Sequence, residues 1–482
     1  MEMVWSVLAG ICVALLFSLA IFIHEFGHFL AARWLGLQVD AFSIGFGPSI
    51  WKRTVNGIEY KIGCVPFGGY VALPQLDPSG MEKVQGETHG EGKGEARKLP
   101  DIPPWKRIVV AFAGPSGNVV LAILLAYVIF FAPGVKTGVV DTRIGAVAED
   151  SEAWKAGVRA GDRILTVNGK KVSTWIDLQV EYQLAGESGA ATFGIQQENG
   201  GGRVVVLPFQ TNNFAELRVL SGVYPETLCL VSSVLPGSPA AASGLRTNDV
   251  IQAANGVPVR GAYHFSSIIR ENGGVPVLLT VKRGKALKQF SVTPVYDQAA
   301  GRHLIGIVWK DGTERVKAWM MYRNPWRQLE WDSMSVVRVL QALIMPDSKG
   351  ERKAVAKNVG GPVAIVIGLY HTVRGGMMDA LGFLRMICVN LAILNLLPFP
   401  VLDGGHIIFA LYEVITRRKP HPKVVSVLVN AFAVLLIGLM LLLFYSDIVK
   451  QVKYTKAVRA FEREAGEEAA RTSSATNGLL KP

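Results

Sequence analysis

Four long apolar segments limit the fold of this chain more than any other feature of its sequence. They cover Met3 to Ile23, Ile108 to Phe131, Gly382 to Leu397 with its flanks, and Val424 to Phe444. Each is close to the roughly 20 residues that a helix needs to cross about 30 Å of hydrocarbon. A cleaved signal peptide is the alternative for the first segment, which however lacks a basic start and a small-residue cleavage site. The sequence therefore predicts a polytopic α-helical membrane protein with four spans.

The charge of the chain indicates its orientation in a membrane. The net charge is +12, but no basic stripe alternates with aromatic residues, so nucleic acid is not an expected partner. Lys106 and Arg107 precede the second span, and a basic segment at 416–423 joins the third span to the fourth. Because positive loops stay in the cytoplasm, the loops after spans one and three face inward. The N-terminus, the large middle segment and the tail then face outward.

The segment between the second and third spans contains an internal repeat. "AGVRAGDRILTVNGKKV" at 156–172 aligns with "SGLRTNDVIQAANGVPV" at 243–259, and this period suits a duplicated small domain. In each copy an Asp precedes an apolar strand that ends in an Asn-Gly hairpin turn. The pattern resembles tandem PDZ-like α+β domains at 135–212 and 222–297. Such domains bind an extended peptide by adding it to a sheet edge, and the predicted ligands here are peptide C-termini. The alternative is that the two domains are β-rich spacers without a ligand.

The remaining segments are assigned from composition. Residues 37–73 combine paired glycines, β-prone residues and an Asn-Gly turn, which predicts a β-hairpin, whereas 74–107 is rich in Gly, Pro and charge and predicts a flexible cytoplasmic linker. In chain order the other predicted segments are the first span with its histidine motif (1–36), the second span (108–133), amphipathic linker helices (313–350), the third span region with a broken helix (360–403), a cytoplasmic connection (404–423), the fourth span (424–445) and the tail (446–482).

The motif "HEFGH" at the end of the first span is the main candidate for chemistry. His24 and His28 are four residues apart, so on a helix both imidazoles project from one face and can reach a single ion. Zinc suits such a pair, and Glu25 beside it can take a proton from a zinc-activated water and pass it to a leaving amine. The alternative is a pair of histidines at the membrane interface. Because ionisable groups within a span are costly, the sequence favours a functional site.

A catalytic zinc usually has three protein ligands and one open position. The candidates for the third ligand follow a break in the third apolar segment, at Pro398 and Pro400. Broken helices at membrane depth are tolerated where they line a site. Asp403 is favoured over His406 because the two glycines after Asp403 allow close backbone approach, and His406 lies one turn further along.

Together these motifs resemble the site-2 protease family of intramembrane zinc metalloproteases. The resemblance covers nearly the whole chain to about Tyr445 and depends on four features: "HEFGH" in the first span, Gly114-Pro115-x-x-Asn118 in the second, Asn395-Leu-Leu-Pro398-x-Pro400-x-Leu-Asp403-Gly in the third, and the tandem repeats. It implies Zn²⁺ ligation by His24, His28 and Asp403, with general acid/base catalysis by Glu25.

The resemblance also implies how a substrate is held. Asn395, with Pro398 nearby, corresponds to residues that bind the substrate backbone. The hairpin around Gly45, Phe46 and Gly47 resembles a membrane re-entrant β-hairpin whose edge receives the substrate as an added strand.

The implied function is cleavage of transmembrane segments in single-span proteins, such as anti-sigma-factor-like proteins, after their outer domains have been removed. The implied location is the bacterial cytoplasmic (inner) membrane, with the lipid bilayer around the spans, the PDZ-like domains on the outer, periplasmic side and the active site toward the cytoplasm. A general clearance protease for remnant signal peptides is the alternative within enzymes. A non-catalytic peptide-binding membrane scaffold is the alternative from another class.

Overall fold

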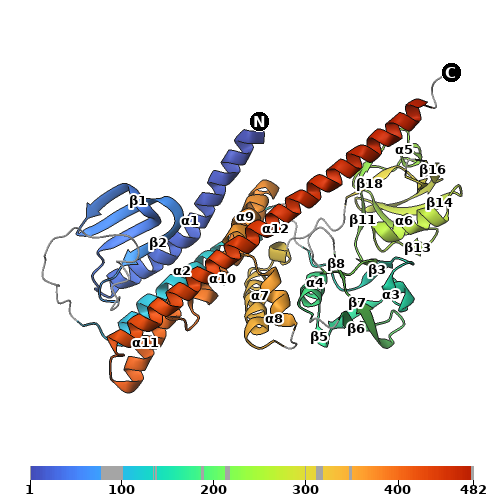
Figure 1. The fold of residues 1–482 in the computed structure, drawn as a ribbon. Coiled ribbons are helices and arrows are strands. Elements are labelled where there is room, and N and C mark those ends of the chain that lie inside the picture. Colours follow the sequence, from blue (N-terminus) through green and yellow to red (C-terminus); the bar gives the residue numbers. More distant parts are fainter. Residues whose placement is uncertain are drawn as a thin grey trace. The chain divides into compact units, whose positions relative to one another are not determined.

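The computed structural model describes residues 2–76, 101–133, 135, 138–185, 189–211, 218–298, 300–310, 318–346 and 350–478. It divides into two compact units, which are described separately. The first comprises Met1–Lys136, Tyr322–Arg338 and Gly360–Thr455, and the second comprises Thr137–Met321, Val339–Val359 and Lys456–Pro482. Figure 1 shows the helices and strands of both units. Most of the predicted linker at 74–107 lies outside the described residues.

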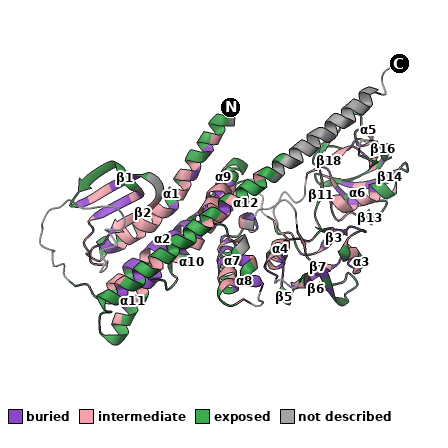
Figure 2. Ribbon diagram, viewed as in Figure 1, coloured by how far each residue is buried: buried purple, intermediate pink, exposed green. Residues whose placement is uncertain are grey.

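Among the described residues, four helices are long and apolar enough to cross a membrane, as the sequence predicts. They are α1 (Glu2–Trp34), α2 (Pro104–Phe131), α10 (Met377–Asn395) and α12 (Pro422–Gly478). Apolar side chains of α12 are exposed along most of its spanning part (Figure 2). Exposure of this kind suits a helix whose solvent is lipid. The helix also continues well past residue 445, where the predicted fourth span ends.

Small residues bring α1 and α2 into backbone contact. A Cβ atom at Gly27 would lie 2.3 Å from the carbonyl oxygen of Ala113, and one at Gly117 would lie 2.6 Å from that of Ile23. Helices in lipid pack this closely where glycines leave room for the backbone. The contact sets the end of α1, with its histidine motif, directly against α2.

A buried ion pair fixes α10 within the first unit. Arg385 on α10 is 1% exposed, and its Nε lies 2.7 Å from Oδ2 of Asp332, which is fully buried on α7 (Pro325–Ile344). The Arg385 guanidinium also donates to the side-chain oxygen of Gln328. Breaking a buried, hydrogen-bonded pair is costly, so α10 is held firmly where it carries Asn395.

The predicted hairpin forms from β1 (Ala41–Val55) and β2 (Ile58–Ala72), which pair in antiparallel fashion. Asn56 and Gly57 make its turn with φ values of 51° and 80°, as an Asn-Gly turn requires. The strands lie against α1, where Phe42 of β1 packs edge-on to Phe29. The base of the hairpin is therefore part of the core around the histidine motif.

The second unit contains the two repeats, each with the same order of elements. The first repeat domain consists of β3 (Ile144–Val147), α3 (Glu152–Lys155), β4 (Arg163–Val167), β5 (Lys170–Lys171), α4 (Trp175–Leu184), β6 (Ala190–Gln196), β7 (Gly202–Pro208) and β10 (Val223–Pro225). The second repeat domain consists of β11 (Cys229–Val234), α5 (Pro239–Ala242), β12 (Val250–Ala254), β13 (Val257–Pro258), α6 (Ala262–Glu271), β14 (Val277–Arg283), β15 (Ala286–Val292) and β18 (Ile307–Lys310). In both domains the last strand pairs with the first, β10 with β3 and β18 with β11.

The remaining elements belong to one unit or the other. They are β8 (Gln210–Thr211), β9 (Arg218–Val219), β16 (Val295–Asp297), β17 (Arg302–Leu304), the 3-10 helix Ala318–Met320, α8 (Glu351–Asn358), α9 (Pro362–Gly375) and α11 (Asp403–Thr416). The predicted amphipathic linker at 313–350 corresponds to the 3-10 helix and α7.

Equivalent residues of the two repeats perform the same local task. Asn168 and Asn255 have φ values of 49°, and the side-chain oxygen of each accepts a hydrogen bond of 2.8 Å from a backbone N–H group, on β6 in the first repeat and on β14 in the second. Gly161 and Asn248 occupy the same turn with φ values of 94° and 68°. Asparagine tolerates this left-handed conformation better than most residues, so the replacement leaves the turn intact.

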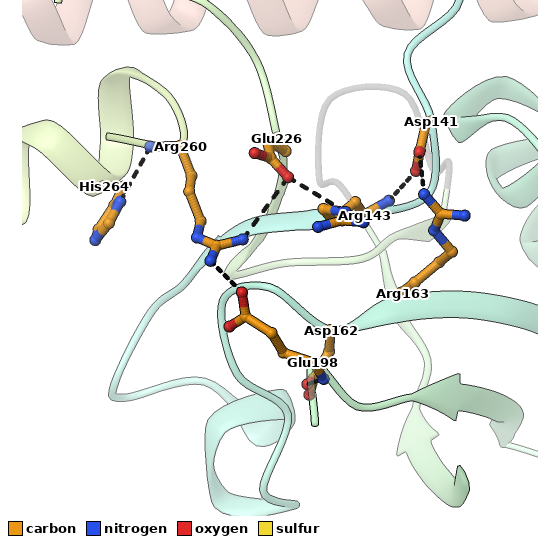
Figure 3. Close-up of polar contacts among 8 residues, drawn as sticks. All are labelled: Asp141, Arg143, Asp162, Arg163, Glu198, Glu226, Arg260 and His264. Atoms are coloured by element: carbon orange, nitrogen blue, oxygen red, sulfur yellow. Dashed lines mark hydrogen bonds and ion pairs between the residues drawn. The ribbon is translucent and has the colours of Figure 1, made fainter. Parts of the chain in front are cut away.

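Charged residues join the first repeat domain to the second (Figure 3). Oε2 of Glu226, between the domains, lies 3.5 Å from Nε of Arg143 and 3.8 Å from Nη1 of Arg260. Arg260 also pairs with Glu198 on the opposite domain. A single solvent-exposed ion pair contributes little to stability. In a network, one ordered side chain takes part in several ion pairs, so less side-chain entropy is lost for each pair.

The two repeats differ in how they hold their turn aspartate. Asp249 is fully buried and accepts hydrogen bonds of 2.7 Å from Nε and Nη2 of Arg283, whereas Asp162 accepts from the backbone N–H groups of Arg159 and Glu198. Burial raises the pKa of the Asp249 carboxyl, but the bonds from Arg283 and from backbone outweigh it, so the net pKa lies below its usual value. The second repeat domain therefore depends on this charge.

We expect Asp249→Asn to destabilise the second repeat domain by about 2 kcal/mol, because Arg283 loses a charged acceptor. The lowered folded pKa means that this stabilisation is complete above the unfolded pKa of about 3.9 and is lost as the pH falls through the folded value. Hydrogen exchange of the β12 and β14 amides in the full chain measures the effect. Asp162→Asn is the matched control, and an equal loss there would contradict the role assigned to Arg283.

Candidate metal centre

The histidines of the first apolar helix face the beginning of α11. Asp403 is the first residue of α11, and its Oδ2 lies 3.2 Å from Nε2 of His24, while its Oδ1 lies 3.4 Å from Nε2 of His28. The two Nε2 atoms are 3.3 Å apart. Side chains from α1 and α11 thus form a triangle in which each histidine nitrogen faces a different oxygen of Asp403.

This triangle has the dimensions of a zinc site. With metal–ligand distances of about 2.0–2.1 Å and tetrahedral angles, adjacent ligand atoms are separated by roughly 3.3 Å. The separations of 3.2, 3.3 and 3.4 Å are close to that value, and the first and last of them end on the two different oxygens of Asp403. Two imidazoles and one carboxylate are also a donor set that zinc accepts in catalytic sites. The residues present therefore fit a zinc ion.

The side chains of the triangle are largely buried, and close backbone packing positions Asp403. The side chains of His24 and Asp403 are 12% and 18% exposed. A Cβ atom at Gly404 would lie 2.2 Å from the carbonyl oxygen of Leu397, and one at Gly405 would lie 2.2 Å from that of Phe399. Only glycine fits at both positions, because the first turn of α11 lies directly on the broken segment before it. The paired glycines after Asp403 thus have a structural cause.

His406 is not part of this triangle. Among the described residues, the group with ligand atoms close enough to share one ion consists of His24, His28 and Asp403. His406 follows three residues later in α11. The structure therefore brings together the set that the sequence favours.

Glu25 lies beside the triangle and against the hairpin. A Cβ atom on Gly69 of β2 would come within 3.2 Å of Cγ of Glu25, so glycine leaves space for the glutamate. The backbone N–H of Val71 donates to the Glu25 carboxylate. The hairpin therefore fixes the carboxylate next to both histidines.

The predicted substrate-binding residues are only partly gathered here. Nδ2 of Asn395, at the end of α10, lies 3.5 Å from Nε2 of His24. Pro398 is exposed in the turn between α10 and α11. Gly45 and Gly47 adopt φ values of 83° and 84° in β1, and the side chain of Phe46 lies outside the described residues.

Two partners of the histidine rings were not assigned by sequence reasoning. Nδ1 of His28 lies 2.7 Å from the carbonyl oxygen of Val110, and Nδ1 of His24 lies 3.3 Å from the side-chain amide of Asn118. A backbone carbonyl carries no sequence signature. Asn118 belongs to a quoted motif, but no role could be given to it without the packing of α2 on α1.

Comparison with known proteins gives consistent matches over most of the chain. The model of peptidase family M50 matches residues 12–439. The regulator of sigma-E protease RseP of Escherichia coli (strain K12) is 30% identical over 473 residues, covering 93% of this chain and 99% of that protein. Protease RseP of Yersinia pestis is 30% identical over 478 residues, with the same coverage of both chains.

A solved structure matches a small part of this chain. The PDZ domain of an SdrC-like protein from Listeria monocytogenes is 26% identical, covers 18% of this chain and 92% of that chain, and has a TM-score of 0.17.

Proposed function

The chain belongs to peptidase family M50 and is a metalloprotease, and from this premise we propose that it is an intramembrane zinc endopeptidase that cleaves transmembrane segments. The observation that carries the proposal is the triangle of His24, His28 and Asp403 within a unit made of apolar helices. An active site among membrane-spanning helices is suited to cleave peptide bonds that lie in or near the bilayer.

His24, His28 and Asp403 are the proposed zinc ligands. When bound, zinc would lower the pKa of a water molecule and polarise the scissile carbonyl. Glu25 is the proposed general base and acid, because it lies beside two ligands and accepts a hydrogen bond from Val71. It takes the proton from the attacking water and delivers it to the leaving amine.

Asn395 is the proposed anchor for the substrate backbone. Its amide lies next to His24, and an amide offers both donors and an acceptor to an unwound peptide. Peptide bonds in a helix are already hydrogen-bonded, so the substrate has to unwind before attack. The β1–β2 hairpin is proposed as a membrane re-entrant element that gives the unwound segment an edge to pair with. Gly45, Phe46 and Gly47 of β1, and Pro398 in the turn before α11, are the further residues proposed to contact the substrate.

The two repeat domains are proposed as tandem PDZ-like modules on the outer side of a bacterial inner membrane, with the metal site toward the cytoplasm. Their repeated element order and the strand pairing of β10 and β18 support this assignment. In this arrangement they exclude single-span substrates that still carry a bulky outer domain. Anti-sigma-factor-like proteins and remnant signal peptides are substrates of the required kind, and the name of the Escherichia coli relative, regulator of sigma-E protease, favours the first.

The direct test uses purified protein and a single-span substrate without its outer domain. We expect cleavage that a zinc chelator abolishes and that added zinc restores. A second substrate that keeps its outer domain should be cleaved more slowly. Cleavage that continues in the chelator would contradict a zinc endopeptidase.

The third ligand can be tested separately by metal content. Asp403→Ala is expected to lose bound zinc, because two imidazoles alone leave the ion with too few protein ligands. His406→Ala is the matched control, since it removes a possible ligand from the same helix, and it should keep zinc at the wild-type level. Zinc retained by the Asp403 variant and lost by the His406 variant would reverse the assignment.

A further inference from the structure

The imidazole of His24 imposes a chemical requirement on its neighbour Asn118. For His24 to bind an ion through Nε2, which faces Asp403 and His28, that nitrogen has to be unprotonated. The proton of the neutral ring then resides on Nδ1. Nδ1 of His24 is therefore an N–H donor in the metal-binding state.

His28 already satisfies the same requirement. Its Nδ1 lies 2.7 Å from the carbonyl oxygen of Val110, which can only accept a hydrogen bond. That contact fixes the tautomer of His28 with Nε2 free for the ion. The two histidines thus need equivalent partners, and His28 finds one in the backbone of α2.

The partner of His24 is the fully buried side chain of Asn118. With Nδ2 at 3.3 Å from Nδ1 of His24, two donors would face each other, and Oδ1 would have no partner among the described residues. The two ends of an amide have nearly the same shape, so the hydrogen-bond network decides which end faces a neighbour. Rotation of the amide by half a turn gives Oδ1 a donor and gives the Nδ1 proton an acceptor.

We propose that Asn118 is the positioning residue of His24, and that its side-chain oxygen accepts the Nδ1 proton and thereby holds the ring in its metal-binding tautomer and orientation. This inference rests on the proposed zinc site. Asn118 is suited to the task because α2 cannot move away from α1, where Gly117 packs on the backbone of Ile23. Partners of this kind also raise the basicity of the ligand, and their loss typically weakens metal binding about 10- to 100-fold.

Two substitutions of nearly equal size separate the hydrogen bond from packing. Asn118→Leu keeps the volume but removes the acceptor, and we expect zinc affinity to fall about 10- to 100-fold, measured by competition with a chromophoric chelator. Asn118→Asp keeps an acceptor in the same place and is expected to retain affinity within a few-fold of wild type. Ser116→Ala, two residues earlier on α2, removes a hydroxyl that donates a hydrogen bond of 2.7 Å to the carbonyl oxygen of Phe112, and it should leave affinity unchanged.

The cobalt-loaded protein provides a second readout that depends on ligand geometry. The visible spectrum of the Asp variant should match that of wild type, whereas the Leu variant should show a weaker or shifted band. Equal zinc affinity in wild type and Asn118→Leu would overturn the proposal and leave the zinc site itself standing. Absence of zinc binding by the wild-type protein would instead refute the proposed function.

Equal losses in the Leu and Asp variants would also contradict the acceptor role, because the aspartate retains an oxygen at the critical position. Circular dichroism of each variant excludes unfolding as the cause of a loss.

Discussion

Glu25→Gln is expected to abolish peptide cleavage while the protein keeps its zinc. The substitution preserves the size of the side chain and the hydrogen bond that the Val71 N–H donates, but glutamine cannot take a proton from water. General base and acid steps contribute about 10²- to 10⁴-fold to the rate, and here one residue carries both. We expect a fall of at least 10²-fold in single-turnover cleavage of a single-span substrate.

Zinc content and substrate binding distinguish this effect from damage to the site. Both should stay at wild-type levels, because Glu25 is outside the ligand triangle. Glu59→Gln is the matched control: Glu59 lies on β2 and pairs with the buried Lys61 at 2.9 Å, so the change weakens an ion pair of the hairpin and leaves Glu25 in place. Equal cleavage by wild type and Glu25→Gln would refute a metalloprotease mechanism.

The parts that sequence could predict are those with a local cause. The four spans follow from apolar length, and the histidine pair follows from the helical period, which places His24 and His28 on one face. The repeat domains likewise follow from turns that Asn168 and Asn255 impose. In each case the residues that determine the structure are close together in the chain.

The parts that sequence could not predict depend on contacts between distant segments. Val110 acts through its backbone carbonyl oxygen, and Gly69 acts through the absence of a side chain beside Glu25. Neither residue has a functional side chain that would mark it in the sequence. Asn118 shows one, but its partner lies 94 residues away. The role of such positions appears only when the helices are packed.

Gly114 is the clearest case of a residue whose absent side chain shapes the site. A Cβ atom there would lie 2.2 Å from Nε2 of His28 and 2.5 Å from Cε1. The ring cannot turn aside without cost, because its Nδ1 bonds to Val110 and its Nε2 faces Asp403. Gly114→Ala therefore has to displace either the imidazole or α2 itself.

We expect Gly114→Ala to reduce both zinc affinity and cleavage by about 10²-fold, since displacement of a reacting group by about 1 Å has effects of that size. Gly438→Ala is the matched control, because it makes the same change in another apolar helix where a new Cβ meets nothing within 4 Å. Alanine is the better helix former by about 1 kcal/mol, so neither change should unfold its helix. Zinc titration and single-turnover cleavage of both variants measure the difference. If Gly114→Ala keeps wild-type zinc affinity, the added methyl group has displaced α2 and not His28. The close packing of α2 on His28 would then not be required for zinc binding.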